Sequence, residues 1–326
     1  MRALYLDRVL TLRRDYPDPR SVPGEAIVKV RLSGICGTDL ELISGYMAHR
    51  GVLGHEFVGE VVATAGNGSG AGAPEGAELA QRRVVGEINV GCGRCHACRA
   101  DLERHCPNRT VLGVLGRDGS FAEYLSLPPR NLLPVPDSVP DEMAVFCEPV
   151  AAACEILEQV RFDGRETIAV LGDGRLGAVV AMVLAAEGLN PVLAGRHPEK
   201  LARLGALGLR TNLESKMEPG FDMVVDCTGN PAGFERAVAL TRPRGRIVLK
   251  STTALGGNLN LAPIVIDEVT VVGSRCGRFE PALKLLASGK VDPRPLISAA
   301  YPLDQGIEAM AASHEPPNFK ILIRPS

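Results

Sequence analysis

The sequence lacks any long uninterrupted run of apolar residues. A helix that spans a bilayer needs about 20 consecutive, mostly apolar residues, and no stretch of these 326 residues approaches that length. The first seven residues also lack the apolar core of a secretory signal peptide. We therefore expect a cytoplasmic protein with no membrane partner.

An excess of charge of either sign is missing as well. The chain has 36 Lys and Arg residues against 38 Asp and Glu residues, for a formal net charge of −2. A protein that binds nucleic acid usually carries a basic excess or patch, so we expect no nucleic-acid partner. The hydrophobic content of 45% is typical of a globular protein, and the length predicts two domains.

The cysteines do not suggest a disulfide framework, because nine is an odd number. Four of them follow the spacing C-x2-C-x2-C-x7-C, at Cys92, Cys95, Cys98 and Cys106. Four thiolates from one short lobe can close a tetrahedron around a structural zinc, which leaves no coordination position open for chemistry. A ferredoxin-like iron–sulfur cluster is the alternative. Clustered thiolates of this kind also indicate a reducing compartment.

A second group of metal-binding residue types lies upstream, in Gly34-Ile35-Cys36-Gly37-Thr38-Asp39 and in Gly54-His55-Glu56. A thiolate, an imidazole and a carboxylate suit zinc, and three protein ligands leave a fourth position open for water or substrate. Thr38 would place a hydroxyl beside the same metal, and Asp39 could accept the second ring N–H of His55. The alternative is a buried cysteine and an unrelated histidine that never meet.

Taken together, these motifs resemble the zinc-dependent medium-chain dehydrogenase/reductases, the alcohol and polyol dehydrogenases, from about residue 25 to the C-terminus. The resemblance implies an α/β protein in which a β-rich, GroES-like catalytic domain accompanies a Rossmann doubly wound parallel sheet. The implied boundaries are 1–147 for the catalytic domain, with the structural zinc lobe at 91–107, and 148–275 for the dinucleotide-binding domain. Residues 276–326 would return to the catalytic domain. Family members are homodimers or homotetramers joined through their cofactor domains.

Glu148-Pro149 sits within an apolar run, 141–160, that predicts a helix. The branch that resembles sorbitol, threonine and glucose dehydrogenases carries Glu-Pro here, where simple alcohol dehydrogenases place a zinc-binding cysteine. The resemblance thus implies a catalytic zinc at Cys36, His55 and a carboxylate, either Glu148, Glu56 or both. Thr38 would take the proton of the substrate hydroxyl. Liver-type enzymes continue that relay with a histidine, at a position that is Glu41 in this sequence.

The first domain contains alternating segments at 26–32 and 57–63 that predict half-buried strands, with a further strand at 84–86. The Gly-, Ala- and Ser-rich segment 65–76 predicts an exposed loop. We also expect a strand at 119–124 and, near the C-terminus, two helical segments and an edge strand at 320–323.

The second half of the chain begins with a dinucleotide-binding pattern. A continuous apolar run at 167–171 predicts a buried parallel strand, and it leads into the sequence Gly172-Asp173-Gly174-Arg175-Leu176-Gly177. A helical stretch at 178–186 and a second strand at 191–194 follow. In this context G-x-G-x-x-G predicts a pyrophosphate site at the helix N-terminus. Further strands at 221–229, 245–250 and 269–274, around a helix at 231–241, predict a doubly wound parallel sheet, with Thr228 assigned to the cofactor site.

The end of the second strand bears on the choice of cofactor. NAD-binding family members have an acidic residue there, which falls on Gly195 or Arg196 in this sequence, just before His197. A glycine leaves room for a 2′-phosphate and an arginine can hold it, so NADP is favoured over NAD. The alternative is a solvated arginine.

The sequence therefore predicts a zinc-dependent oxidoreductase with two zinc ions per chain. It would transfer a hydride between NADP and a secondary alcohol of a polyol, sugar or amino alcohol. Two alternatives remain open at this point: an NADPH-dependent aldehyde or ketone reductase, and a non-catalytic dinucleotide-binding protein of the same fold.

Overall fold

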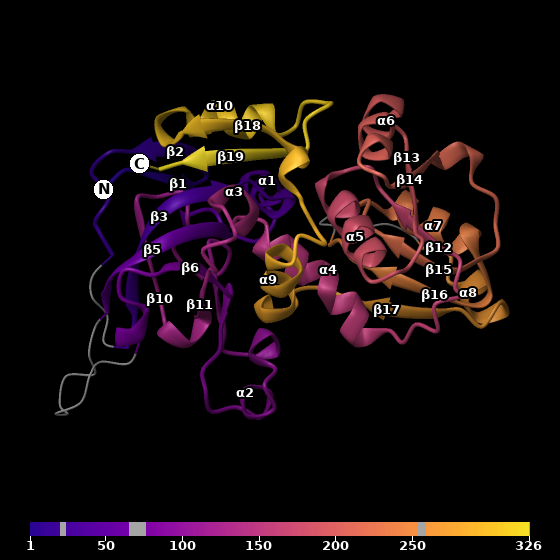
Figure 1. Cartoon of the computed structure of the whole chain (residues 1–326), viewed down its shortest axis with the longest axis horizontal. Coiled ribbons are helices and arrows are strands. Elements are labelled where there is room, and N and C mark those ends of the chain that lie inside the picture. The colour runs from indigo at the N-terminus through magenta and orange to yellow at the C-terminus, as the bar shows by residue number, and fades with distance from the viewer. Residues whose placement is uncertain (20–23, 65–75, 253–258, 326) are drawn as a thin grey trace. The chain divides into compact units, whose positions relative to one another are not determined.

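The computed structural model describes residues 1–19, 24–64, 76–252 and 259–325. The loop expected at 65–76 lies outside these residues except for Gly76. The chain divides into two compact units (Figure 1): unit 1 comprises Met1–Glu148 with Leu296–Ser326, and unit 2 comprises Pro149–Pro295. We expected the chain to return to the catalytic domain at residue 276, whereas it rejoins unit 1 at Leu296.

Unit 1 is built mainly from strands. Its largest sheet has the order β11-β6-β5-β3-β19-β18, with β10 also paired to β3, and two small sheets have the orders β2-β1-β4 and β7-β8-β9. The strands are β1 (Ala3–Asp7), β2 (Val9–Arg13), β3 (Ala26–Gly34), β4 (Gly51–Val52), β5 (Glu56–Thr64), β6 (Arg83–Gly86), β7 (Asn89–Val90), β8 (Thr110–Leu112), β9 (Gly116–Arg117), β10 (Tyr124–Leu127), β11 (Leu132–Pro134), β18 (Ile297–Pro302) and β19 (Lys320–Arg324).

Two expectations for these strands were wrong. Strand β19 is not an edge strand, because it lies between β3 and β18, and its residues 320–323 are all buried. Strand β18 has little alternation of apolar and polar residues, so its pairing with β19 was not foreseen. Residues 119–123 do not form the expected strand. Instead, the N–H groups of Gly119 and Phe121 donate to Val52 and Leu53, which ties this segment to the loop that precedes His55.

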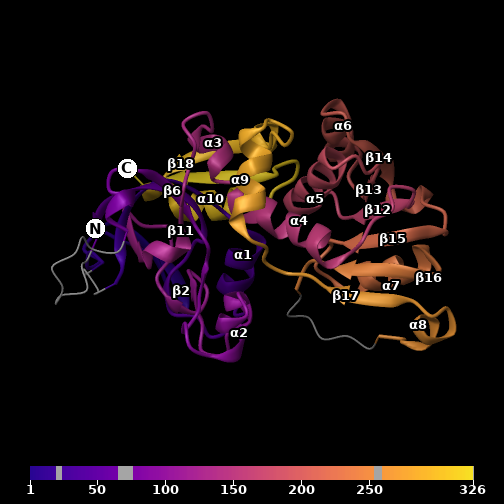
Figure 2. The same cartoon turned by 60° about the horizontal axis from the view of Figure 1, so that its bottom comes forward.

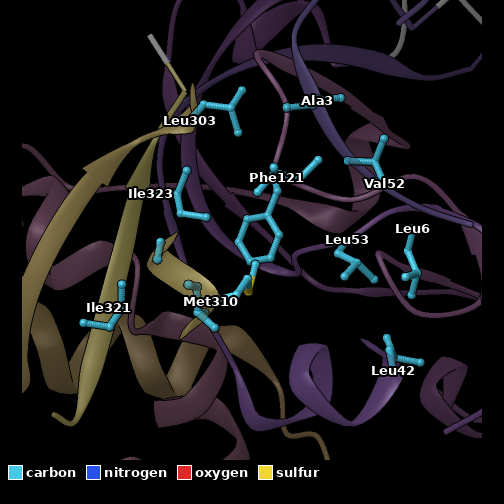
Figure 3. Close-up of a cluster of buried hydrophobic side chains, with 14 residues drawn as sticks. Ala3, Leu6, Leu42, Val52, Leu53, Phe121, Leu303, Met310, Ile321 and Ile323 are labelled. Atoms are coloured by element: carbon cyan, nitrogen blue, oxygen red, sulfur yellow. The ribbon is translucent and has the colours of Figure 1, made fainter. Parts of the chain in front are cut away.

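A hydrophobic cluster in unit 1 surrounds Phe121, whose ring lies among side chains from both ends of the chain (Figure 3). Met310 and Ile321 come from the C-terminal segment, and Leu53 comes from the loop that leads to His55. Ile35, next to Cys36, is also fully buried in this cluster. The cluster therefore fixes the backbone on either side of the predicted metal ligands.

Unit 2 contains a six-stranded sheet with the order β14-β13-β12-β15-β16-β17, in which every neighbouring pair is parallel. Helix α5 packs on β12 and β13, α6 on β13 and β14, and α7 on β15 and β16 (Figures 1 and 2). The strands are β12 (Ile168–Leu171), β13 (Val192–Gly195), β14 (Arg210–Leu213), β15 (Phe221–Asp226), β16 (Thr241–Leu249) and β17 (Thr270–Gly273). The predicted combination of a β-rich domain and a doubly wound parallel sheet is confirmed.

The α-helices of the two units are α1 (Gly37–Ile43), α2 (His96–Arg99), α3 (Asp141–Ala144), α4 (Cys147–Gln159), α5 (Arg175–Ala186), α6 (Pro198–Ala206), α7 (Pro231–Leu240), α8 (Ala262–Ile266), α9 (Phe279–Ala287) and α10 (Gly306–Ala312). Single turns of 3-10 helix lie at Ala77–Leu79, Glu103–His105, Pro129–Asn131, Glu214–Lys216, Arg294–Leu296 and Leu303–Gln305. Within the described residues, no helix combines the length and the apolar content that crossing a bilayer requires.

The single helix expected over 141–160 was wrong, because the chain forms α3 and then α4 with a break at Val145 and Phe146. Proline is tolerated in the first turn of a helix, but in a helix interior its ring clashes with the carbonyl four residues earlier. A continuous helix would set Pro149 against the carbonyl of Val145. Starting α4 at Cys147 places Pro149 in the first turn and gives Glu148 a position at the helix N-terminus.

The sheet order of unit 2 also locates its binding edge. Strand β12 lies between β13 and β15. The chain places β13 and β14 on one side of β12 and then crosses to place β15, β16 and β17 on the other, so the strand order reverses between β12 and β15. Open parallel sheets bind ligands at the carboxyl ends of their strands at such a point. The glycine-rich loop follows β12 and Thr228 follows β15, so the predicted cofactor residues gather at this edge.

Candidate metal and cofactor sites

The Asp39 carboxylate joins the two loops that carry the predicted zinc ligands. Its Oδ2 accepts the backbone N–H of Cys36 at 2.8 Å, and its Oδ1 accepts that of Gly54 at 3.2 Å. Cys36 is the N-cap of α1, and an acidic side chain in the first turn satisfies a free N–H group and suits the positive end of the helix. Asp39 is 0% exposed, so this link is held away from solvent.

Beside this link, three metal-binding side chains converge. The Sγ of Cys36, a ring nitrogen of His55 and a carboxylate oxygen of Glu56 all lie within 4.8 Å of one another. His55 Nδ1 is 3.3 Å from Asp39 Oδ1, which leaves Nε2 available to a metal ion. Thr38 Oγ1 is 3.8 Å from Cys36 Sγ, so the hydroxyl lies next to the same group.

The electrostatics of the group suit a cation. Burial alone lowers the pKa of His55, but the charges of Asp39 and Cys36, together with hydrogen bonds to both, raise this pKa well above its ordinary value. The surroundings of His55 therefore stabilise positive charge. A thiolate and an imidazole in one group, with a carboxylate beside them, fit zinc better than calcium or magnesium.

Sequence reasoning missed Lys320, which forms a buried ion pair with Glu56. The Lys320 ammonium donates to Glu56 Oε2 and, at 3.2 Å, to the carbonyl of Ile35. The two side chains are 2% and 1% exposed. A lysine directly before the apolar run Ile321-Leu322-Ile323 was the available signal. Glu56 therefore forms an ion pair with the Lys320 ammonium and at the same time belongs to the metal-binding group.

Two other predicted residues are not among these converging side chains. Glu148 is half-buried in the first turn of α4 and is not among the three side chains that converge in the described residues. Glu41 is exposed on α1. The assignment of Glu148 as a zinc ligand therefore stays a prediction.

The four clustered cysteines come together in the lobe around α2. Their Sγ atoms all lie within 4.8 Å of one another, and Cys95 caps α2 by accepting the N–H of Cys98 at 3.5 Å. Hydrogen bonds from the backbone N–H groups of Arg94 and Cys95 lower the pKa of Cys92 to about 6, whereas burial raises that of Cys98 to about 11. All nine cysteines are free thiols. Four thiols at this separation fit a tetrahedral zinc.

The cofactor residues line the edge of the unit 2 sheet. Gly172 has a φ of 112°, which favours glycine, and its N–H donates to Ala194 at 2.8 Å. A Cβ at Gly177 would overlap the carbonyl oxygen of Gly172, so the last glycine of the motif lets α5 approach the loop. Gly174 is the N-cap of α5. This geometry fits a dinucleotide pyrophosphate.

The remaining cofactor residues follow β13 and β15. The backbone N–H and the hydroxyl of Thr228 donate to Asp226 Oδ1 at 2.9 and 2.7 Å. Gly195 ends β13, Arg196 is exposed, and the backbone of His197 donates to Asp173. Sequence reasoning assigned no role to Asp173.

The Lys320–Glu56 pair gives a prediction for stability. Substituting Lys320→Met leaves a buried carboxylate without its partner, which costs about 3–5 kcal/mol of unfolding free energy. The double variant Lys320→Met/Glu56→Gln should recover much of this loss. Urea unfolding measures both, with the exposed Lys29→Met on β3 as the matched control. A loss for Lys320→Met no larger than that of the control would contradict the pair.

Comparisons with known proteins bear on both units. The alcohol dehydrogenase GroES-like domain matches residues 22–137, and the zinc-binding dehydrogenase domain matches residues 176–288. The chain is 30% identical to an L-threonine 3-dehydrogenase of Chelativorans sp. (strain BNC1), over 95% of this chain and 92% of that one.

Solved structures agree with this match. A short chain alcohol dehydrogenase of Escherichia coli CFT073, complexed with NADH, superposes with a TM-score of 0.87 at 26% identity, covering 99% of both chains. A Sinorhizobium meliloti 1021 protein described as a zinc-binding dehydrogenase, bound to NADP, gives a TM-score of 0.87 at 25% identity, again over 99% of both chains. With its GroES-like domain, its parallel sheet and its grouped cysteine, histidine and glutamate, the chain belongs to the zinc-binding alcohol dehydrogenase family.

Proposed function

We propose that the protein is a zinc-dependent dehydrogenase that prefers NADP and oxidises a secondary alcohol of a polyol, sugar or amino alcohol. The convergence of Cys36, His55 and Glu56 carries this proposal, because a family member that had lost turnover would have no reason to keep the group intact. The similarity to an L-threonine 3-dehydrogenase, whose substrate is an amino alcohol, supports the substrate class.

Each of the site residues of unit 1 has its own proposed role. Cys36 and His55 would hold the catalytic zinc, with Glu56 or Glu148 as the carboxylate, and Asp39, whose Oδ1 lies 3.3 Å from His55 Nδ1, would orient the ring. When bound, zinc supplies a Lewis acid that lowers the pKa of the substrate hydroxyl, and NADP supplies the hydride acceptor. Thr38 Oγ1, beside Cys36, would accept the proton that the hydroxyl releases while it passes its own proton on toward solvent. The four-cysteine lobe would hold the second zinc, which stabilises the fold.

The cofactor proposal depends on unit 2. The glycine-rich loop and the N-terminus of α5 would bind the pyrophosphate. Gly195 and Arg196 support NADP over NAD, because the end of β13 carries no acidic side chain to accept the ribose hydroxyls. One solved relative holds NADH and another NADP, so the family accommodates both.

A homo-oligomer is proposed from the edge of the same sheet. Within the part of the chain that the structure describes, strand β17 pairs with β16 alone. Nearby, α8 exposes Val265 and Ile266, which are 76% and 77% accessible. Unpaired strand edges and clustered exposed apolar residues mark association surfaces. Two copies could bury this surface symmetrically.

The two zinc roles are separable by mutation. The parent protein should hold about two zinc ions per chain and the variants Cys36→Ser and Cys106→Ser about one each. Cys106→Ser should strongly lower stability because structural zinc contributes folding free energy, whereas Cys36→Ser should abolish turnover with a smaller loss. Elemental analysis and thermal unfolding measure these effects, and Cys154→Ala should keep both metals. Iron, or a single zinc in the parent, would contradict the assignment.

The substrate class is tested by comparing alcohols. A carboxylate ligand makes the zinc site harder and richer in oxygen, and a site that hydrogen-bonds several hydroxyls rejects analogues that lack them. Vicinal polyols, sugars or amino alcohols should therefore exceed ethanol in kcat/KM by roughly 100-fold or more. Glu148→Gln should lower kcat/KM without changing the Kd of NADPH, and Glu142→Gln, at a half-buried position of α3, should change neither. Efficient ethanol oxidation with no gain from added hydroxyls would contradict the proposal.

The association surface is tested by placing a charge on it. Ile266→Glu should shift the protein toward the monomer, because an unpaired carboxylate would be buried between two copies. Light scattering after size-exclusion chromatography measures the mass, and Ile307→Glu, at an exposed position of α10 in unit 1, is the control. A monomeric parent, or an Ile266→Glu variant that remains assembled, would show that this edge is not an interface.

A further inference from the structure

Asp173 and His197 form a contact that the glycine-rich motif does not require. Asp173 lies between β12 and α5 and is 7% exposed. Its Oδ2 accepts the backbone N–H of His197 at 2.7 Å, and both of its oxygens lie 3.0 Å from His197 Nδ1. Because an ionised carboxylate can only accept, Nδ1 carries the hydrogen in this contact. The imidazole is 42% exposed and keeps Nε2 for another partner.

The same carboxylate explains the glycine at the end of β13. A Cβ built on Gly195 would overlap the Cβ and the carboxylate of Asp173. Asp173 thus fills the space where the side chain of residue 195 would begin. An acidic side chain at position 195 has no room here, and the carboxylate that does lie here belongs to the glycine-rich loop and is bound to His197.

The charged groups around this contact are mostly positive. Burial lowers the pKa of Lys200 on α6. The charges of Asp173 and Glu199 raise this pKa, whereas those of Arg175 and Arg203 lower it. Among the described residues Arg196 is exposed and makes no ion pair or hydrogen bond. Arg175 and Arg203 thus add positive charge to the field at Lys200, and together with the exposed Arg196 this field suits an anionic ligand.

We propose that Asp173 is a positioning residue for the choice of cofactor. It holds His197 through Nδ1–H so that Nε2–H of the imidazolium and the Arg196 guanidinium together donate to the 2′-phosphate of NADP, and it does not itself accept the ribose hydroxyls. This inference rests on the proposed NADP preference. Two features of Asp173 support positioning over direct binding: its oxygens are already engaged by His197, and its side chain is almost entirely buried.

The test uses two ligands that differ by one phosphate, 2′,5′-ADP and 5′-AMP. Neither carries the nicotinamide, so calorimetric titration of the zinc-loaded protein measures the adenosine end alone. The parent should bind 2′,5′-ADP more tightly. His197→Ala and Asp173→Ala should each weaken 2′,5′-ADP about tenfold, because a charge-assisted contact is lost, and leave 5′-AMP within about twofold. The double variant should lose no more than either single variant, since both act through one contact.

The outcomes separate this inference from the proposed function. Equal binding of the two ligands by the parent would overturn the NADP preference itself. A preference that survives in both single variants would overturn the positioning role while leaving NADP in place. Selective loss of 5′-AMP in Asp173→Ala would make Asp173 a direct ribose acceptor, contrary to the proposal. If Asp173→Ala does not fold, His197→Ala decides alone, with the exposed His314→Ala as its control.

Discussion

The unit 1 site depends on one buried carboxylate, that of Asp39. A charge with no exposure to solvent is costly unless hydrogen bonds and opposite charges compensate it. Asp39 has such partners in the N–H groups of Cys36 and Gly54 and in the imidazole of His55. These partners come from two loops separated in sequence by α1, so the carboxylate that needs them also fixes the distance between the metal-binding side chains.

A second buried carboxylate, that of Glu56, is also compensated by an opposite charge. Glu56 faces the metal-binding side chains and is bound by Lys320, which comes from the last strand of the chain. Lys320 is held in turn by the carbonyl of Ile35, the residue before Cys36, and lies 5.6 Å from the centre of the Phe146 ring. The returning C-terminal segment therefore contributes to the charge of the site as well as to the core around Phe121. That contribution offers a physical reason for the discontinuous course of unit 1.

Local motifs predicted more of this protein than long-range pairings did. The grouping of Cys36, His55 and Glu56 followed from two motifs that together resemble a family, and that of the four cysteines followed from their short spacing. Strand β12 with its glycine-rich loop followed from an apolar run before G-x-G-x-x-G. The role of Lys320 was not predicted because its partner is far away in sequence. Strand β19 was wrongly placed at the sheet edge because β18, its neighbour, shows no clear alternation of apolar and polar residues. The Asp173–His197 contact was also missed, since a variable position of a motif carries no signal until the fold brings its partner close.

Zinc X-ray absorption spectroscopy of the metal-loaded chain tests the central claim most directly, because it counts the atoms bound to the metal. Four thiolates at one site and one at the other give an average of about 2.5 sulfur and about 1.5 nitrogen or oxygen neighbours per zinc. The account predicts this mixed shell, with the scattering pattern of an imidazole. A shell of sulfur alone would contradict it, because no metal would then lie at Cys36 and His55.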